Sequence, residues 1–177
     1  MTVIRSDLPK KTKQYFYDLE NYLDTKLYFY GSVNRNDYIH GKSDIDIAVF
    51  TDNEQEMIAK LQHFLKVKKD AFEQLIWKIH GRIIYGYKIK CDKYNDLKCE
   101  ISIYNNEFKN FLLKEFYRDT VLPFHIWFLL LILKTIYYKL GLITSKTYSY
   151  CKRIIYNHFL FKDKSDAIFY LMKPTLY

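Results

Sequence analysis

The sequence predicts an α+β fold, in which a small mixed sheet with helices is followed by a short helical lobe. Two strand-like runs, a helical pattern and a hairpin-like pair of runs fill most of the first 105 residues. All apolar patterns after them have helical spacing. We therefore expect a sheet-bearing lobe at 1–112 and a helical lobe at 113–177.

The first elements are a helix and a buried strand. Apolar and aromatic side chains recur at helical spacing over 11–26, which predicts an amphipathic helix that ends near Thr25. The aromatic run 27–30 then stops at Gly31 and Ser32, two residues typical of tight turns. We expect a short strand there, closed by a turn.

A second strand and one or two helices follow. Residues 44–50 alternate between polar and apolar and then become wholly apolar, so the predicted strand carries Asp44 and Asp46 on one face. Helical spacing covers 53–72 and extends, less clearly, through Leu75 to Ile79. We expect this second stretch to be helical as well.

The remaining elements are a hairpin and three helices. Two runs rich in β-branched and aromatic residues flank a turn-like stretch, which predicts an antiparallel pair over 82–92 and 97–104. Helical patterns then cover 108–116, 123–140 and 145–161.

Composition excludes some classes of protein. The chain has 177 residues, 49% of them hydrophobic and 19% aromatic, far too many for a disordered protein. The formal net charge of +8 favours partners that carry phosphate.

The cysteines and the N-terminal segment predict an intracellular, cytoplasmic protein. Cys91, Cys99 and Cys151 have neither the paired spacing of a disulfide framework nor that of a zinc site. Residues 1–13 lack the apolar core of a signal peptide. The five histidines also lack ligand spacing, so we expect structural roles for them.

One segment resembles a membrane span but is too short. The apolar stretch 121–133 has 13 residues, whereas a span needs roughly 20. Lys134 and Lys139 follow it and would be costly inside a bilayer. We therefore expect a buried helix and no membrane contact.

Asp44 and Asp46 are the first candidates for a chemical role. Two carboxylates on one side of a strand repel each other unless a cation lies between them, and Mg²⁺ prefers such hard oxygen ligands. The alternative is that Asp44 caps a turn and Asp46 faces solvent on an edge strand.

Two further features extend this site. The backbone N–H groups at Gly31 and Ser32 can approach phosphate oxygens closely. Glu100 lies on the second hairpin strand, where burial would isolate its charge unless it joins the same metal site; the alternative is an exposed edge position. Three acids and such a turn are typical of two-metal phosphoryl transfer.

These residues resemble the nucleotidyltransferase superfamily that includes DNA polymerase beta, poly(A) polymerases and CCA-adding enzymes. The first motif is Phe29–Ser32, followed after eleven residues by Asp44–Ile47. The segments 100–105 and 130–150 are similar to the third-carboxylate strand and the central helical domain of the poly(A) and poly(U) polymerase branch.

The resemblance implies a role for each matched residue. Asp44, Asp46 and Glu100 would bind Mg²⁺ or Mn²⁺, and Glu100 would also help to deprotonate the attacking 3′-hydroxyl. The nucleotide would be held by Gly31 and Ser32 at its triphosphate, Asn105 at its ribose, Lys134 and Ser149 at its phosphates, and Tyr150 at its base. Ordinary alternatives are a solvent-reaching Lys134 and a core Tyr150.

Two departures from the family pattern stand out. The branch usually has Asp where this chain has Glu100, and a second lysine where it has Tyr138. The expected function is poly(A) polymerase-like addition of ribonucleotides, from ATP, to RNA 3′ ends. The alternatives are a catalytically silent, RNA-binding or regulatory subunit of a larger polymerase, and a transferase acting on a protein or small molecule.

The expected partners are an RNA 3′ end, a nucleoside triphosphate, and either a second copy of the chain or a partner subunit. No separate RNA-binding domain is evident in the sequence, so the small body would need help to grip the primer. Basic residues that could flank the RNA path fall in three groups: Lys10, Lys11 and Lys13; Lys66, Lys68 and Lys69; Lys88, Lys90 and Lys93.

Overall fold

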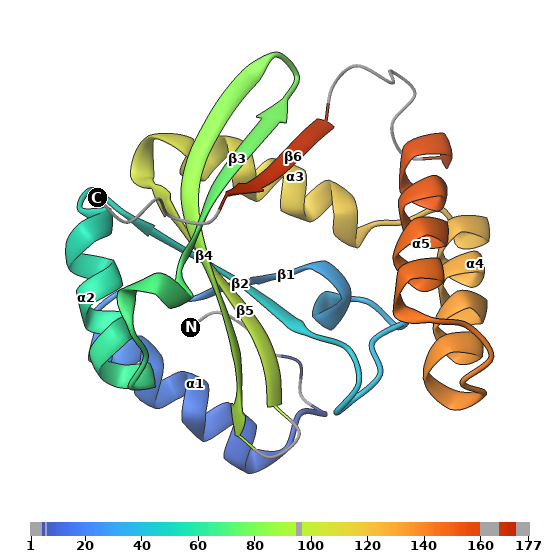
Figure 1. Ribbon diagram of the computed structural model, residues 1–177, viewed down its shortest axis with the longest axis horizontal. Helices are drawn as coiled ribbons and strands as arrows, with labels where there is room; N and C mark the ends of the chain where they lie inside the picture. Colours follow the sequence, from blue (N-terminus) through green and yellow to red (C-terminus); the bar gives the residue numbers. More distant parts are fainter. Residues whose placement is uncertain (1–4, 6, 95–96, 160–166, 173–177) are drawn as a thin grey trace.

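The computed structural model describes residues 5, 7–94, 97–159 and 167–172 and has a single mixed sheet at its centre (Figure 1). Its strands lie in the order β1-β2-β5-β4-β3-β6, and only the β2–β5 pair is parallel. The strands are β1 (Tyr28–Tyr30), β2 (Ile45–Thr51), β3 (Glu73–Ile79), β4 (Arg82–Tyr94), β5 (Leu97–Asn105) and β6 (Ala167–Met172).

Helices α1 (Lys10–Leu23) and α2 (Glu54–Leu65) cover one face of this sheet (Figure 1). The N-terminus of α2 is capped by Asn53, whose side chain accepts a hydrogen bond of 3.1 Å from the Glu56 N–H. The main core lies between these helices and the sheet, where Ile45, Ile47 and Val49 of β2 are fully buried. Since side chains alternate along a strand, Asp46 and Ala48 face the other side.

Helix α3 (Lys109–Thr120) covers part of that other face and closes a second, smaller core. Phe116 of α3 stacks on Tyr30 at the end of β1, with ring centroids 4.0 Å apart. On this face of β2, the second core includes Ala48 and Phe50, toward the end of the strand. Asp46, near the start of the strand, lies outside this core.

Helix α4 (Phe124–Lys134), a π-helical turn (Thr135–Lys139) and α5 (Ser145–Phe159) form the helical lobe beside the sheet (Figure 1). The two helices pack against each other. Within the described residues, no helix has both the length and the apolar character needed to cross a bilayer.

The α+β fold class is confirmed, as are the strand at 44–50 and the hairpin of β4 and β5. The helical prediction at 75–79 is wrong: these residues belong to β3. Short apolar runs do not distinguish a strand from a buried helix, and pairing with both β4 and β6 favours the strand here. Asn95 and Asp96 of the expected turn lie outside the described residues.

The prediction that only helices follow residue 105 is also incomplete, because β6 returns to the sheet and pairs with β3. Apart from β6, the described part beyond this point is helical. The last two residues of the expected helix 145–161 lie outside the described residues.

Candidate functional site

A cavity of about 910 Å³ lies between the polar part of the sheet and the helical lobe. Its floor comes from strands β1 to β5, and its opposite wall from the π-helical turn and α5. Five of the predicted site residues line it: Gly31, Asp44, Asp46, Glu100 and Ser149. The structure therefore brings together most of the motif that the sequence indicates.

The register of three strands places Asp46 at the centre of the floor. Asp46 pairs with Tyr30 of β1 on one side and with Glu100 of β5 on the other. Asp44 immediately precedes β2 and is exposed. Because the positions differ by two residues, both aspartates are set toward the same side of the sheet.

Gly31 is required at its position by two independent features. Its φ of +71° lies in the region that L side chains rarely adopt. A Cβ placed on it would also collide with Oδ2 of Asp46. The absence of a side chain thus lets the turn backbone lie directly against the Asp46 carboxylate.

Burial raises the pKa of both aspartates. The pKa of Asp46 reaches about 6, and burial exceeds the opposing effect of the Lys152 ammonium. Asp44 keeps an exposed side chain but is partly desolvated by the groups around it; this is the first cause of its raised pKa, and the negative charge of Glu100 is the second. A bound cation would relieve this unfavourable concentration of negative charge.

Glu100 is held by two lysines of β4. Its Oε2 forms an ion pair with Lys88 and its Oε1 lies 3.4 Å from the Lys90 Nζ. The side chains of Lys88 and Glu100 are each only 14% exposed, whereas Lys90 is largely solvated. Glu100 is the chief reason that the pKa of Lys90 is raised.

The donor set at Asp44 and Asp46 fits one magnesium ion. Mg²⁺ is commonly held by one or two carboxylates together with substrate phosphates and water. In the described part of the chain, no hydrogen bond or ion pair engages either carboxylate. Across the same part of the chain, no three His, Cys, Asp or Glu side chains gather closely enough to enclose a metal ion.

Apart from Ser149, helix α5 supplies cavity residues that were not predicted from the sequence. The α5 side chains that line the cavity are Ser145, Tyr148, Ser149, Lys152, Arg153 and Tyr156. Their positions recur every three or four residues, so they form one face of the helix. This periodicity is visible in the sequence, but only the structure shows that this face meets the carboxylates.

Four predicted nucleotide-binding residues do not line the cavity. Ser32 lies in the 3₁₀ turn Gly31–Asn34, and Tyr150 is 56% exposed on α5, with the Arg153 guanidinium 5.7 Å from its ring centroid. Asn105 caps the turn at the far end of β5, where its side chain accepts a hydrogen bond from the Glu107 N–H. At about 3.3 Å per residue, that end is roughly 16 Å from Glu100.

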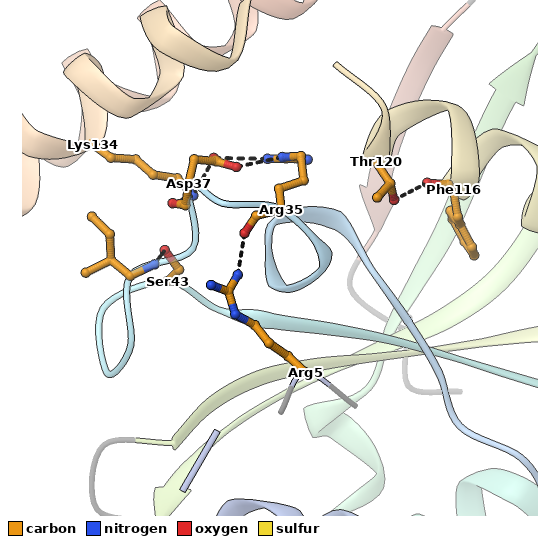
Figure 2. A network of polar contacts seen from close by, with 8 residues as sticks. Arg5, Arg35, Asp37, Ser43, Phe116, Thr120 and Lys134 are labelled. Atoms are coloured by element: carbon orange, nitrogen blue, oxygen red, sulfur yellow. Dashed lines mark hydrogen bonds and ion pairs between the residues drawn. The ribbon is translucent and has the colours of Figure 1, made fainter. Parts of the chain in front are cut away.

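Lys134, the fourth of these residues, is buried in a polar network (Figure 2). Its Nζ donates to the backbone oxygen of Asp37 at 2.8 Å and lies 2.9 Å from the Asp37 carboxylate. Arg35 holds the same carboxylate at 2.8 Å through Nε. Lys134 thus connects α4 to the loop before β2.

The three groups of basic residues expected along an RNA path lie on different parts of the protein. Lys88 and Lys90 line the cavity. The group at 10–13 belongs to α1, and the group at 66–69 follows α2, so both lie with the helices that cover the opposite face. The side chain of Lys93 lies outside the described residues.

The fold and the cavity together define a class of protein. Paired carboxylates beside a glycine turn, with Lys152 and Arg153 on the facing helix, suit the transfer of a phosphate-bearing group. The profile of the family described as "Nucleotidyltransferase domain" matches residues 9–121, more than half of the chain. The chain therefore belongs to the nucleotidyltransferase domain family.

Two solved structures of the Cid1 poly(U) polymerase are similar to this chain. The first, with MgGTP bound, has a TM-score of 0.39 and 16% sequence identity. The match spans 73% of this chain and 43% of the polymerase chain. The second has a TM-score of 0.38 and 17% sequence identity, and the match spans 73% of this chain and 42% of the polymerase chain. The chain thus matches less than half of each polymerase. No curated protein sequence matches it significantly.

Lys152 is expected to contribute to triphosphate affinity. It lines the cavity opposite the aspartates and lowers the pKa of Asp46 more than any other charged group. A hydrogen bond to a charged group contributes about 1.5 to 3 kcal/mol, so Lys152→Ala should raise the KM for the triphosphate by roughly 10- to 100-fold.

Steady-state kinetics with varied triphosphate concentration measures this effect. Lys146→Ala is the matched control, since Lys146 is an exposed lysine of the same helix that does not line the cavity. An equal loss in both variants would show that net charge, rather than position, determines affinity.

Proposed function

We propose that the protein is a template-independent nucleotidyltransferase that adds ribonucleotides to RNA 3′ ends, with ATP as the donor. Membership of the nucleotidyltransferase domain family supports the reaction class. The observation that carries the proposal is the placement of Asp46 against the Gly31 turn, with Asp44 lining the same cavity, which is large enough for a nucleotide.

The cavity offers different surroundings to the two ends of a nucleoside triphosphate: cationic side chains for the phosphates and aromatic rings for the base. Lys152 and Arg153 of α5 line its wall, where they can neutralise phosphate oxygens. Tyr137 and Tyr148 stack on each other with centroids 4.5 Å apart, and both rings border the cavity. Such an aromatic wall can accept any base, because stacking is tolerant of sequence.

The reaction forms one bond and breaks one bond. The oxygen of the RNA 3′-hydroxyl bonds to the α-phosphorus, the bond between that phosphorus and the bridging oxygen breaks, and pyrophosphate leaves with the electron pair. The hydroxyl proton passes to solvent. Asp44 and Asp46 would hold a divalent cation, which supplies charge stabilisation when bound.

The resemblance also implied a second cation and a basic role for Glu100. Both oxygens of the Glu100 carboxylate already face lysines of β4, Oε2 in an ion pair with Lys88 and Oε1 near Lys90. In this proposal Glu100 therefore fixes the lysines, and no proton transfer is assigned to it.

We further propose that the chain grips its primer with the help of a second copy or of a partner subunit. The helical lobe leaves large apolar side chains in solvent, among them Phe124 and Phe128 of α4. An apolar surface of this kind is typical of a protein contact. A partner on it would extend the small body beyond the cavity.

Primer extension tests the proposed function. Purified protein is incubated with a labelled oligo(A) primer and each of the four triphosphates in turn, in Mg²⁺ and in Mn²⁺. We expect tails to grow with ATP and to be absent from an Asp44→Ala, Asp46→Ala double variant.

Each other outcome has a defined meaning. Growth with UTP alone would keep the reaction and change the nucleotide. Transfer to a protein or a small molecule, detected by product mass, would keep the enzyme class and remove RNA as acceptor. No transfer by the folded protein to any acceptor would favour a silent, RNA-binding subunit.

A further inference from the structure

The ion pair between Lys88 and Glu100 lies inside the proposed active site. Glu100 is directly opposite Asp46 in the parallel pair, and Lys90 is directly opposite Glu100 in the antiparallel pair. Lys88 lies two positions before Lys90, on the same face of β4. One row of side chains across the floor therefore runs from Asp46 through Glu100 to Lys90, and Lys88 lies beside this row, opposite Ser102.

This row differs from a site built for two cations. Two-metal transfer places a second ion close to the first, and the family resemblance implies Glu100 as the third carboxylate that would help to hold the pair. Both oxygens of Glu100 are engaged by ammonium groups, and Lys88 is as buried as its partner. A second divalent cation at Glu100 would have to displace Lys88 or lie beside its positive charge, and like charges at such short range repel strongly.

We propose that the site binds a single divalent cation, at Asp44 and Asp46, and that the Lys88 ammonium, positioned by Glu100, supplies the second positive charge. This inference rests on the proposed function and specifies how its site is charged. It also explains why a glutamate can stand at position 100, where the poly(A) and poly(U) polymerase branch usually has an aspartate. The extra methylene lets the carboxylate reach toward β4, where it holds the lysines.

The number of bound Mn²⁺ ions tests the inference without measuring turnover. Mn²⁺ binding to the purified chain is followed by electron paramagnetic resonance, in the presence of a non-hydrolysable ATP analogue. We expect one tight ion per chain in the natural protein. We expect two in the Lys88→Met, Lys90→Met double variant, because Glu100 is then free to become a ligand.

Two further variants complete the design. Lys98→Met removes another lysine from the wall of the same cavity and should leave the count at one. Glu100→Gln should also leave the count at one, with Mn²⁺ affinity changed less than threefold, because Glu100 is not a ligand in the natural protein. Circular dichroism confirms that each variant is folded.

The outcomes separate this inference from the function on which it rests. Two tight ions in the natural protein would overturn the single-cation site and leave the nucleotidyltransferase proposal intact. The same follows if Glu100→Gln loses Mn²⁺ affinity tenfold or more, or if the folded double variant stays at one ion. Failure of the natural protein to bind Mn²⁺, with or without the analogue, would instead count against the proposed function itself.

Discussion

Asp46→Asn will stabilise the ion-free protein near neutral pH while it removes nucleotide transfer. The folded state raises the pKa of Asp46 from 3.8 to about 6, so its charged form is disfavoured by folding. One pKa unit corresponds to about 1.4 kcal/mol, so Asn should raise the free energy of unfolding by up to about 3 kcal/mol. Residues kept for chemistry often lower stability in this way.

The pH dependence of this gain has a defined sign. Because the folded pKa is raised, the folded state holds the Asp46 proton more tightly than the unfolded state does. The contribution of Asp46 to stability is therefore complete below the unfolded pKa of 3.8 and is lost as the pH rises through about 6. The Asn side chain does not titrate in this range. The free energy of unfolding of the variant should therefore rise relative to that of the natural protein between pH 3.8 and about 6, and the difference should stay constant at higher pH.

Urea denaturation at several pH values between 4 and 8, without divalent ions, measures the difference. Asp44→Asn is the matched control: Asp44 is exposed, so its gain should be smaller. Added Mn²⁺ should stabilise the natural protein and leave Asp46→Asn largely unaffected. Equal stability of the two proteins at pH 8 would contradict the assigned burial of this charge.

Asp37→Ala will destabilise the protein by about 3 to 5 kcal/mol, the range found when one partner is removed from a buried ion pair. Asp37 is fully buried, and its carboxylate neutralises both Arg35 and Lys134. Alanine would leave two buried cations without their counter-charge. Thermal or urea unfolding measures the loss.

Lys134→Met tests the same network from its other side. Methionine has a similar length, and Arg35 remains to pair with Asp37, so the loss should be clearly smaller than for Asp37→Ala. Burial of Lys134 already lowers its pKa, which shows that its charge is partly disfavoured there. A larger loss for Lys134→Met would mean that packing of α4 dominates this contact.

The network also predicts weakening in acid. Burial alone would raise the pKa of Asp37, but Arg35 and Lys134 outweigh it and hold this pKa below 3.8. A lowered folded pKa means that the stability contributed by Asp37 is complete above 3.8 and is lost as the pH falls through the folded value. The difference in free energy of unfolding between the natural protein and Asp37→Ala should therefore shrink in strong acid.

The sequence predicted those parts of the site that are close together along the chain. Asp44 and Asp46 follow the Gly31 turn closely, and the pairing of β1 with β2 brings the two features together. Glu100 could be predicted because a charge in an apolar strand requires a partner. Its lysine partners were not predicted, because they depend on the register of β4 against β5, which includes an irregularity between Cys91 and Tyr94.

Long-range contacts account for what the sequence did not predict. Lys134 interrupts an apolar helix, as a phosphate-binding lysine would, but its partner Asp37 is 97 residues away along the chain. The strand β3 was mistaken for helix because its stability comes from the neighbours β4 and β6. The α5 face with Lys152 has an ordinary amphipathic pattern, and only the docking of α5 makes it a site.

The return of β6 to the sheet makes the α4–α5 pair an insertion between two anchored segments, with α3 packed on the sheet before it and β6 hydrogen-bonded to β3 after it. A lobe attached at one end can swing on a single hinge, whereas one attached at both ends can only pivot about the line that joins its attachments. Opening of the cavity would then be a rocking motion of small amplitude. A chain shortened before β6 would lose this second attachment, and β3 would become a bare edge open to pairing with another molecule.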